Sequence, residues 1–177
     1  MKFISFEKSG VAGYGAVIGD RVVDLSKSFS DRYADMRAVL EADALPELQK
    51  AAEGSTGDYD LADVTLLRPV TNPRMTICVG VNYANRNAEY KDGSQDPGFP
   101  SLFMRTPQSL VAQGEDIHRP PESDQLDYEG EIVLVIGKGG RRIAEDQALD
   151  HVAGVTIMNE GTLRDWIRHA KFNVTQG

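Results

Sequence analysis

Residues 126–136 read Leu-Asp-Tyr-Glu-Gly-Glu-Ile-Val-Leu-Val-Ile and decide the fold of the second half of the chain. The second half of this stretch is a continuous apolar, largely β-branched run that ends at Gly137, which is typical of a buried strand. Glu129 and Glu131 stand two positions apart at its start. Because residues i and i+2 of a strand point to the same face, we expect the two carboxylates side by side, roughly 6–7 Å apart at Cβ.

Two glutamates this close destabilise a fold that presses both into one pocket. At an effective dielectric near 20, two unit charges at this separation repel by about 2–3 kcal/mol. Such a pocket requires a shared proton or a bound cation. If both side chains instead lie on a solvated strand face, salt screens the repulsion and no ligand is needed. A further acid, Glu160, follows a second predicted strand at residues 154–158 and favours the cation.

The overall composition is that of a globular protein. The 177 residues are 41% hydrophobic and 26% charged, enough for one core or two small ones. A net charge of −8 with no basic stripe argues against nucleic-acid and membrane partners. The single cysteine, Cys78, permits no intramolecular disulfide. With neither a signal peptide nor a membrane span in view, we expect a cytoplasmic protein.

The chain divides into two expected domains. Residues 1–68 form a small α+β domain, with strand-like segments up to residue 25 and helices at about 30–40 and 46–52. Polar residues 53–58 are typical of a flexible linker. Residues 69–177 form the second domain, whose expected elements are strands at 75–79, 101–105, 130–136 and 154–158, helices at 144–152 and from a capping box at 162–165 onward, and a lid-like loop at 91–100.

Four motifs in order resemble the fumarylacetoacetate hydrolase family. They are Gly80-x-Asn82-Tyr83 with Glu89, Leu-Phe-Met-Arg at 102–105, Asp-Tyr-Glu-Gly-Glu at 127–131, and Asn-Glu at 159–160 followed by Arg-Asp-Trp at 164–166. Each motif alone is weak, but their order is specific, and the resemblance covers roughly residues 70–177. It implies a mixed β-roll catalytic domain within an α+β fold, a homodimer, and a small N-terminal domain of the kind many bacterial members carry.

The resemblance also implies a divalent metal held by Glu129, Glu131 and Glu160. An all-carboxylate set with no Cys or His suits a hard ion such as Mg²⁺, Mn²⁺ or Ca²⁺. The implied substrates are small 2-oxo or enol diacids whose carbonyl and carboxylate oxygens chelate the ion. The metal then stabilises an enolate while a C–C bond is hydrolysed or a double bond moves.

Four further residues match catalytic or substrate-binding positions of the family. Arg105 matches a substrate-anchoring cation, with a surface salt bridge as the alternative, and Tyr83 lines the same pocket or belongs to the core. Glu89 matches a catalytic acid, but Arg86 stands where the family's hydrolases place a water-activating histidine. A guanidinium cannot act as a base near neutral pH. Either Glu89 takes the proton alone, or Arg86 holds a substrate carboxylate, or the two form an ordinary helix-face ion pair.

Other departures from the family pattern leave the reaction open. Glu160 replaces the usual aspartate, Ile167 replaces a polar glutamine, and the family's catalytic lysine would fall beyond Gly177. We therefore expect a fold that is incomplete at its C-terminus and a truncated chain, with completion of the sheet by assembly as the alternative. The hypotheses are a C–C bond hydrolase, an isomerase, hydratase or decarboxylase of hydroxymuconate-type diacids in aromatic catabolism, and a catalytically silent metal- or ligand-binding homologue. The three histidines, His118, His151 and His169, are expected to be structural.

Overall fold

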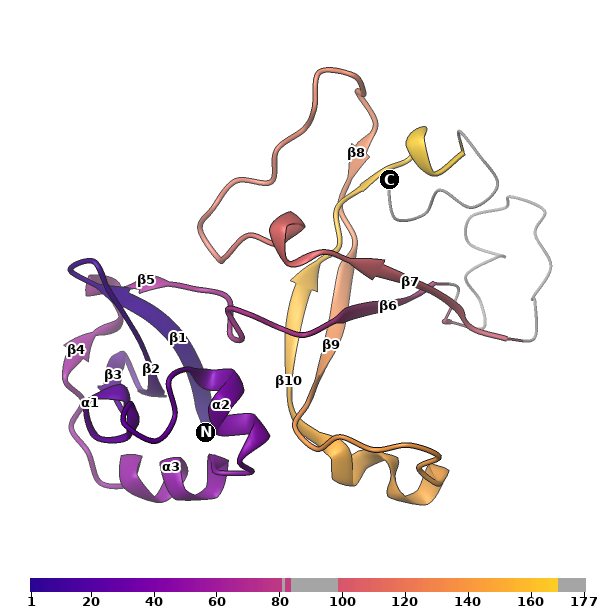
Figure 1. The fold of residues 1–177 in the computed structure, drawn as a ribbon. Coiled ribbons are helices and arrows are strands. Elements are labelled where there is room, and N and C mark those ends of the chain that lie inside the picture. The colour runs from indigo at the N-terminus through magenta and orange to yellow at the C-terminus, as the bar shows by residue number, and fades with distance from the viewer. Residues whose placement is uncertain (81, 84–98, 169–177) are drawn as a thin grey trace. The chain divides into compact units, whose positions relative to one another are not determined.

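The structure, a computed structural model, describes residues 1–80, 82–83 and 99–168. It combines helices with antiparallel sheets (Figure 1), in agreement with the expected α+β class. The chain groups into two compact units. The first unit comprises Met1–Asn72, Val111–Ile117 and Tyr128–Glu160, and the second comprises Pro73–Leu110, His118–Asp127 and the described part of Gly161–Gly177. The predicted domain boundary at residues 68–69 stays a prediction.

The N-terminal part of the first unit is a five-stranded antiparallel sheet of order β4-β3-β2-β1-β5 (Figure 1). Ser9 and Gly10 join the first two strands, and both have positive φ (54° and 80°), as a two-residue hairpin with the correct twist requires. The expected strands before residue 25 are thus confirmed. The strands are β1 (Lys2–Lys8), β2 (Val11–Ile18), β3 (Arg21–Asp24), β4 (Tyr59–Asp60) and β5 (Thr65–Leu66).

The predicted helix at residues 30–40 is wrong in its bounds. The chain instead forms α1 (Ser26–Phe29) and α2 (Met36–Glu41). The second begins after Asp35, whose Oδ1 accepts a hydrogen bond from the Ala38 amide at 2.8 Å and so caps the helix. The helix predicted at residues 46–52 is confirmed as α3 (Leu45–Ala52). A short 3₁₀ helix, η1 (Leu61–Asp63), precedes β5.

The core of this region lies between the sheet and the helices. Tyr14 is buried in it, and its hydroxyl donates to the Tyr33 carbonyl at 2.7 Å. Burial is the main reason that the pKa of Tyr14 is raised to about 12, so the phenol stays neutral near pH 7. The cluster contains Tyr14, Ala16, Val23, Leu25, Met36, Val39, Leu40, Ala44, Leu48 and Ala52.

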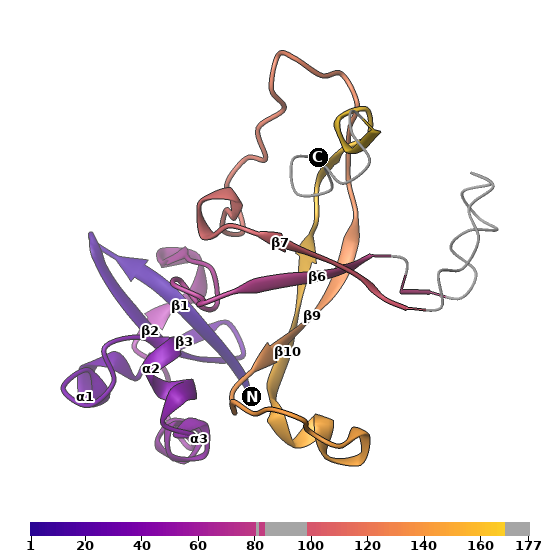
Figure 2. The same ribbon diagram turned by 45° about the vertical axis from the view of Figure 1, so that its right-hand side comes forward.

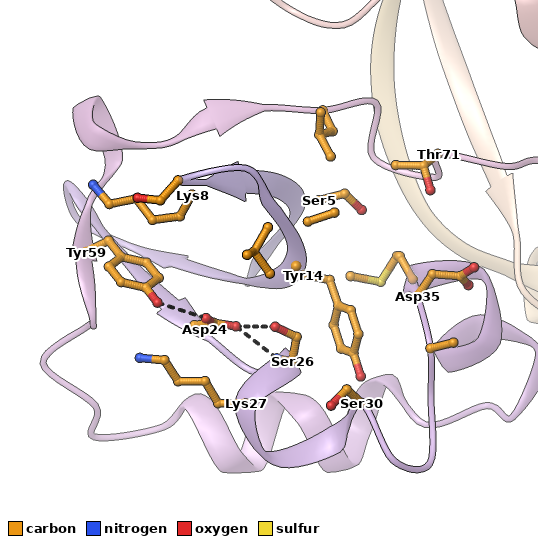
Figure 3. A pocket seen from close by; sticks show the side chains of 17 residues that line it. Ser5, Lys8, Tyr14, Asp24, Ser26, Lys27, Ser30, Asp35, Tyr59 and Thr71 are labelled. Atoms are coloured by element: carbon orange, nitrogen blue, oxygen red, sulfur yellow. Dashed lines mark hydrogen bonds between the residues drawn. The ribbon is translucent and has the colours of Figure 1, made fainter.

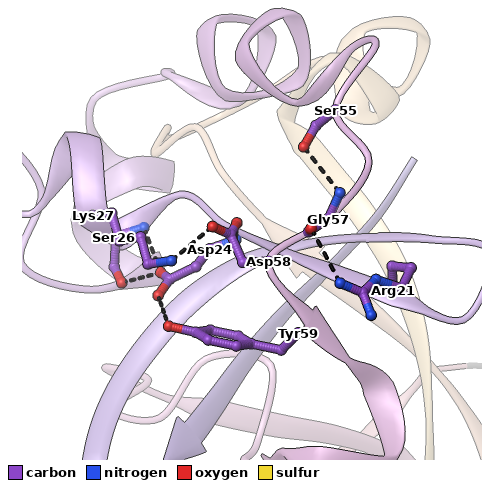
Figure 4. A network of polar contacts seen from close by, with 8 residues as sticks. All are labelled: Arg21, Asp24, Ser26, Lys27, Ser55, Gly57, Asp58 and Tyr59. Carbon is purple, nitrogen blue, oxygen red and sulfur yellow. Dashed lines mark hydrogen bonds and ion pairs between the residues drawn. The ribbon is translucent and has the colours of Figure 1, made fainter.

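A polar network fixes the segment that was expected to be a flexible linker (Figure 4). The Asp58 carboxylate accepts from Lys27 Nζ at 2.6 Å and from the Asp24 amide at 2.8 Å, and the Asp58 amide donates to the Val22 carbonyl at 2.7 Å. The hydrogen bond from Lys27 lowers the pKa of Asp58. The Gly57 carbonyl also accepts from Arg21 on β3. Because Gly57 and Asp58 are bound to β3 and α1 in this way, the linker prediction for 53–58 is wrong at the C-terminal end of the segment.

The glutamate stretch forms an antiparallel hairpin of β9 (Gly130–Ile136) and β10 (Val152–Asn159), seen side by side in Figures 1 and 2. The strand predictions are confirmed, but β9 is not fully buried. Val133 and Val135 are half-buried, whereas Ile132 is 65% exposed and Leu134 and Ile136 are exposed as well. An apolar run in the sequence predicts a strand but does not predict whether each face of the strand is buried.

The helix predicted at residues 144–152 is a 3₁₀ helix, η3 (Glu145–His151). All its residues up to Asp150 are exposed, so no apolar face is available to stabilise a longer α-helix by packing. His151 joins this segment to the end of β9: its carbonyl accepts from the Gly137 and Lys138 amides, and its Nδ1 lies 2.8 Å from the Lys138 carbonyl oxygen.

The second unit contains two small antiparallel pairs. They are β6 (Thr76–Gly80) with β7 (Ser101–Arg105), and β8 (Leu126–Asp127) with β11 (Thr162–Leu163), accompanied by the 3₁₀ helices η2 (Pro107–Ser109) and η4 (Trp166–Arg168). The helix predicted from residue 162 is wrong at its start, because Thr162 pairs with Asp127 in a sheet, and its part beyond residue 168 lies outside the described residues. The Asp165 carboxylate accepts from Ser123 Oγ at 2.7 Å and from the Trp166 amide instead of completing a capping box.

Two further predictions concern residues outside this description. The helix expected after Gly80, with Arg86 and Glu89, and the lid-like loop at 91–100 fall mainly in the segment 84–98, which the structure does not describe. Within the described residues, no helix has the length and hydropathy that crossing a bilayer would require.

Candidate functional site

The three glutamates predicted as metal ligands come together along the backbone at one end of the β9–β10 hairpin. Glu131 lies on β9 opposite Met158, Glu129 immediately precedes β9, and Glu160 immediately follows β10. The Glu160 amide donates to the Glu129 carbonyl oxygen at 2.7 Å. Antiparallel pairing therefore places residues that are about 30 positions apart in the sequence at adjoining backbone positions.

The three side chains differ in their exposure. Glu160 is only 6% exposed, which is unusual for a carboxylate, and Glu129 and Glu131 are half-buried. Glu131 shares the half-buried face of β9 with Val133 and Val135, whereas Ile132 is on the exposed face. Glu131 therefore lies at the start of the half-buried apolar face of β9.

The donor set fits a hard divalent ion, although the side chains do not form a finished metal site. Within residues 1–80, 82–83 and 99–168, no three His, Cys, Asp or Glu side chains are grouped so that they could hold a metal ion. The three carboxylates at the hairpin end supply only oxygen donors, which Mg²⁺, Mn²⁺ and Ca²⁺ prefer. Binding would require their side chains to turn toward one another, and their assignment as ligands stays a prediction.

Sequence reasoning gave no role to Asn159, the residue before Glu160. Its Oδ1 accepts a hydrogen bond from the Glu129 amide at 3.0 Å. Glu129 thus binds the end of β10 through both of its backbone polar groups. The sequence signal was an amide residue at a strand end, but the contact depends on the register Gly130↔Asn159, which no local pattern reveals.

The residues predicted to bind substrate lie in the second unit. Arg105 ends β7, and its Nη2 lies 3.5 Å from the Gly161 carbonyl oxygen and 3.4 Å from Thr162 Oγ1. Tyr83 is 64% exposed, so it does not belong to a core of the described structure. Arg86 and Glu89 lie outside the described residues. The catalytic and substrate-binding roles of these four residues stay predictions.

A hollow of about 730 Å³ lies in the N-terminal part of the first unit (Figure 3). Its polar end is formed by Lys8, Asp24, Lys27 and Tyr59, and both ammonium groups lie over the Tyr59 ring. These charges already bind protein groups: Lys8 pairs with Asp63, Lys27 with Asp58, and Asp24 accepts from Ser26 and Tyr59. None of the predicted site residues lines the hollow, and the charges at its polar end are paired with protein groups.

A family model and the similar known proteins point to the same family. The family model described as "Fumarylacetoacetate (FAA) hydrolase C-terminal" matches residues 75–177. Oxaloacetate tautomerase fahd2, mitochondrial, of Xenopus laevis is 33% identical over 84% of this chain and 46% of its own length. Oxaloacetate tautomerase YisK of Bacillus subtilis is 32% identical over 97% of this chain and 64% of its own length. The chain therefore spans about half to two thirds of these relatives.

Solved structures agree with the fold. Fumarylacetoacetate hydrolase from Exiguobacterium antarcticum superposes with a TM-score of 0.72 at 30% identity, over 99% of this chain and 61% of that one. Maleylpyruvate hydrolase from Sphingobium sp. SYK-6, solved with manganese(II) and pyruvate, gives a TM-score of 0.74 at 22% identity over 98% of this chain and 64% of that one, which shows the fold alone. These matches confirm the predicted fold class, and the chain belongs to the fumarylacetoacetate hydrolase family.

Proposed function

We propose that this chain provides the acidic metal site of an enzyme that acts on small 2-oxo diacids, and that its reaction is keto–enol tautomerisation. The observation that carries the proposal is that Glu129, Glu131 and Glu160 occupy adjoining backbone positions at one end of the β9–β10 hairpin. The relatives from Xenopus laevis and Bacillus subtilis are both oxaloacetate tautomerases by name and both more than 30% identical to this chain, which supports the choice of reaction. Tautomerisation needs no activated water, which agrees with Arg86 at the position of the family's water-activating histidine.

The proposed roles divide between holding a metal and moving a proton. Glu129, Glu131 and Glu160 hold Mg²⁺ or Mn²⁺, and the manganese in the maleylpyruvate hydrolase structure supports a divalent ion at this fold. When bound, the ion would polarise the carbonyl group of the substrate. Arg105 binds a substrate carboxylate, with Tyr83 beside it and Arg86 as a second cation. Glu89 takes the proton from the carbon next to the carbonyl and returns it to the carbonyl oxygen, so one proton moves from carbon to oxygen and Glu89 ends as a carboxylate again.

A second candidate reaction is the hydrolysis of a C–C bond in an acylpyruvate-type substrate. It is favoured by the fumarylacetoacetate hydrolase structure at 30% identity. Hydrolysis needs a base that activates water, and Glu89 would have to do this without a histidine. The expected homodimer and the expected cytoplasmic location remain predictions on either reading.

Spectrophotometry of oxaloacetate in the presence of the 177-residue chain tests this proposal. The ultraviolet absorbance of the enol should decay faster with protein and Mn²⁺ than with Mn²⁺ alone, and EDTA should abolish the difference until Mn²⁺ is restored. Full activity after EDTA treatment, or no acceleration beyond the metal-only control, would refute the proposal. Cleavage of an acylpyruvate without tautomerisation would select the second candidate.

A further inference from the structure

We infer that Asn159 is a positioning residue for the acidic site, because its side chain holds the backbone of Glu129 at the end of β10. The inference rests on the proposed function, since it gives Asn159 a role in the affinity of that site for a divalent ion. Asn159 itself is not a ligand in this account. It acts through the main chain of Glu129, which we propose as one of the ligands.

The β9–β10 ladder ends one residue short of the two outer glutamates. The last paired residues are Gly130 and Asn159, so Glu129 and Glu160 lie just outside both strands. Two further hydrogen bonds continue the connection beyond the ladder. Asn159 Oδ1 accepts from the Glu129 amide at 3.0 Å, and the Glu129 carbonyl accepts from the Glu160 amide at 2.7 Å. The Asn159 side chain and the Glu160 main chain therefore bind both backbone polar groups of Glu129.

Asn159 occupies an exposed position at the end of β10. Alternate residues of this strand, Val155 and Ile157, present exposed aliphatic side chains, and position 159 continues the same row. An exposed amide side chain at a strand end has water as an alternative partner, yet that of Asn159 bonds back to the Glu129 main chain. Such side-chain bonds to the backbone take the place of ladder bonds where a ladder stops.

Holding the Glu129 backbone in place affects how the three carboxylates would bind an ion. A divalent ion requires its oxygen ligands within a few tenths of an ångström of their bonding distances. The Asn159 side chain fixes the Glu129 amide at the end of β10, which reduces the conformational freedom that binding would otherwise remove. The amide does this without placing another negative charge beside Glu129, Glu131 and Glu160, whose mutual repulsion already opposes their approach. Hydrogen-bond partners of the ligating side chains themselves typically contribute 10- to 100-fold to metal affinity. Because Asn159 bonds the backbone of Glu129 instead, we expect an effect at the lower end of that range.

The test measures Mn²⁺ affinity, which does not depend on turnover. Mn²⁺ is titrated into the 177-residue chain, and electron paramagnetic resonance measures the Mn²⁺ that remains free. The proteins compared are wild type, Asn159→Ala and Asn159→Asp. We expect Asn159→Ala to bind Mn²⁺ at least about tenfold more weakly than wild type. Asn159→Asp keeps an acceptor of the same shape for the Glu129 amide. Its added charge repels the three carboxylates but also attracts the cation, so we expect it to bind Mn²⁺ within about threefold of wild type. Amide hydrogen exchange at Glu129 should be faster in Asn159→Ala only.

Asp35→Ala supplies the matched control for lost stability. It also removes a side-chain acceptor from a backbone amide, that of Ala38 at 2.8 Å, but in the N-terminal helix α2. It should lower the thermal midpoint and leave the Mn²⁺ affinity unchanged. Wild-type affinity in Asn159→Ala, or an equal loss of affinity in Asp35→Ala, would overturn the positioning role alone. No Mn²⁺ binding by wild type would overturn the proposed function and this inference with it.

Discussion

Replacing Glu131 with glutamine should reduce the proposed tautomerase turnover about 100-fold or more. The glutamine side chain has the same length, so packing on the half-buried face of β9 is retained while one negative ligand is lost. A divalent ion contributes several kcal/mol to the stabilisation of negative charge that develops on a carbonyl oxygen. Losing about 3 kcal/mol of that contribution corresponds to roughly a 100-fold fall in rate. Initial rates at saturating oxaloacetate and fixed Mn²⁺ measure the effect.

Glu145→Gln is the matched control for this substitution. Glu145 is an exposed residue of η3, so its variant changes the net charge by the same amount away from the three proposed ligands. Its turnover should stay within about twofold of wild type, as is usual for surface substitutions. A Glu131→Gln enzyme with wild-type turnover, or equal losses in the two variants, would exclude Glu131 from the chemistry.

Replacing Leu48 with alanine should lower the free energy of unfolding by about 2–5 kcal/mol. Leu48 is fully buried, with an exposed fraction of 0%, and belongs to the core cluster beneath the N-terminal sheet. Its truncation removes buried methyl groups and leaves a cavity that close-packed neighbours fill only in part. Since small domains are stable by only about 5–15 kcal/mol, the variant should show a clearly lower urea midpoint.

Leu149→Ala gives the comparison at an exposed position. Leu149 is 79% exposed in η3, so the same truncation there should change the free energy of unfolding by no more than about 0.5 kcal/mol. Similar losses for the two variants would show that the N-terminal core is not packed as described.

Strands could be predicted from the sequence more reliably than helices in this protein. Alternation and β-branched runs located β1, β2, β9 and β10, because side-chain period and strand geometry are local properties. The capping-box pattern at 162–165 failed because Thr162 pairs with Asp127, 35 positions earlier by sequence number, and a local pattern contains no information about such a partner. The prediction of a flexible linker at 53–58 failed at Asp58 for the same reason, because Asp58 is bound by Lys27 and Val22, which lie far from it in the sequence.

The candidate site shows the same division between local and long-range information. The motifs identified Glu129, Glu131 and Glu160 as a group, and the i, i+2 spacing placed the first two at one strand start. The register that joins the Glu160 amide to the Glu129 carbonyl could not be predicted from the sequence, nor could the hydrogen bond from Glu129 to Asn159. Both depend on how two distant strands align, which is set by pairing across the sheet rather than by either segment alone.

The anomalous difference map of crystals soaked in Mn²⁺ tests the central claim most directly. The three-carboxylate account predicts a single strong peak at the end of the β9–β10 hairpin, with carboxylate oxygens of Glu129, Glu131 and Glu160 roughly 2.0–2.6 Å from the ion. A map with no peak at that end of the hairpin, or a peak whose ligands exclude these carboxylates, would contradict it.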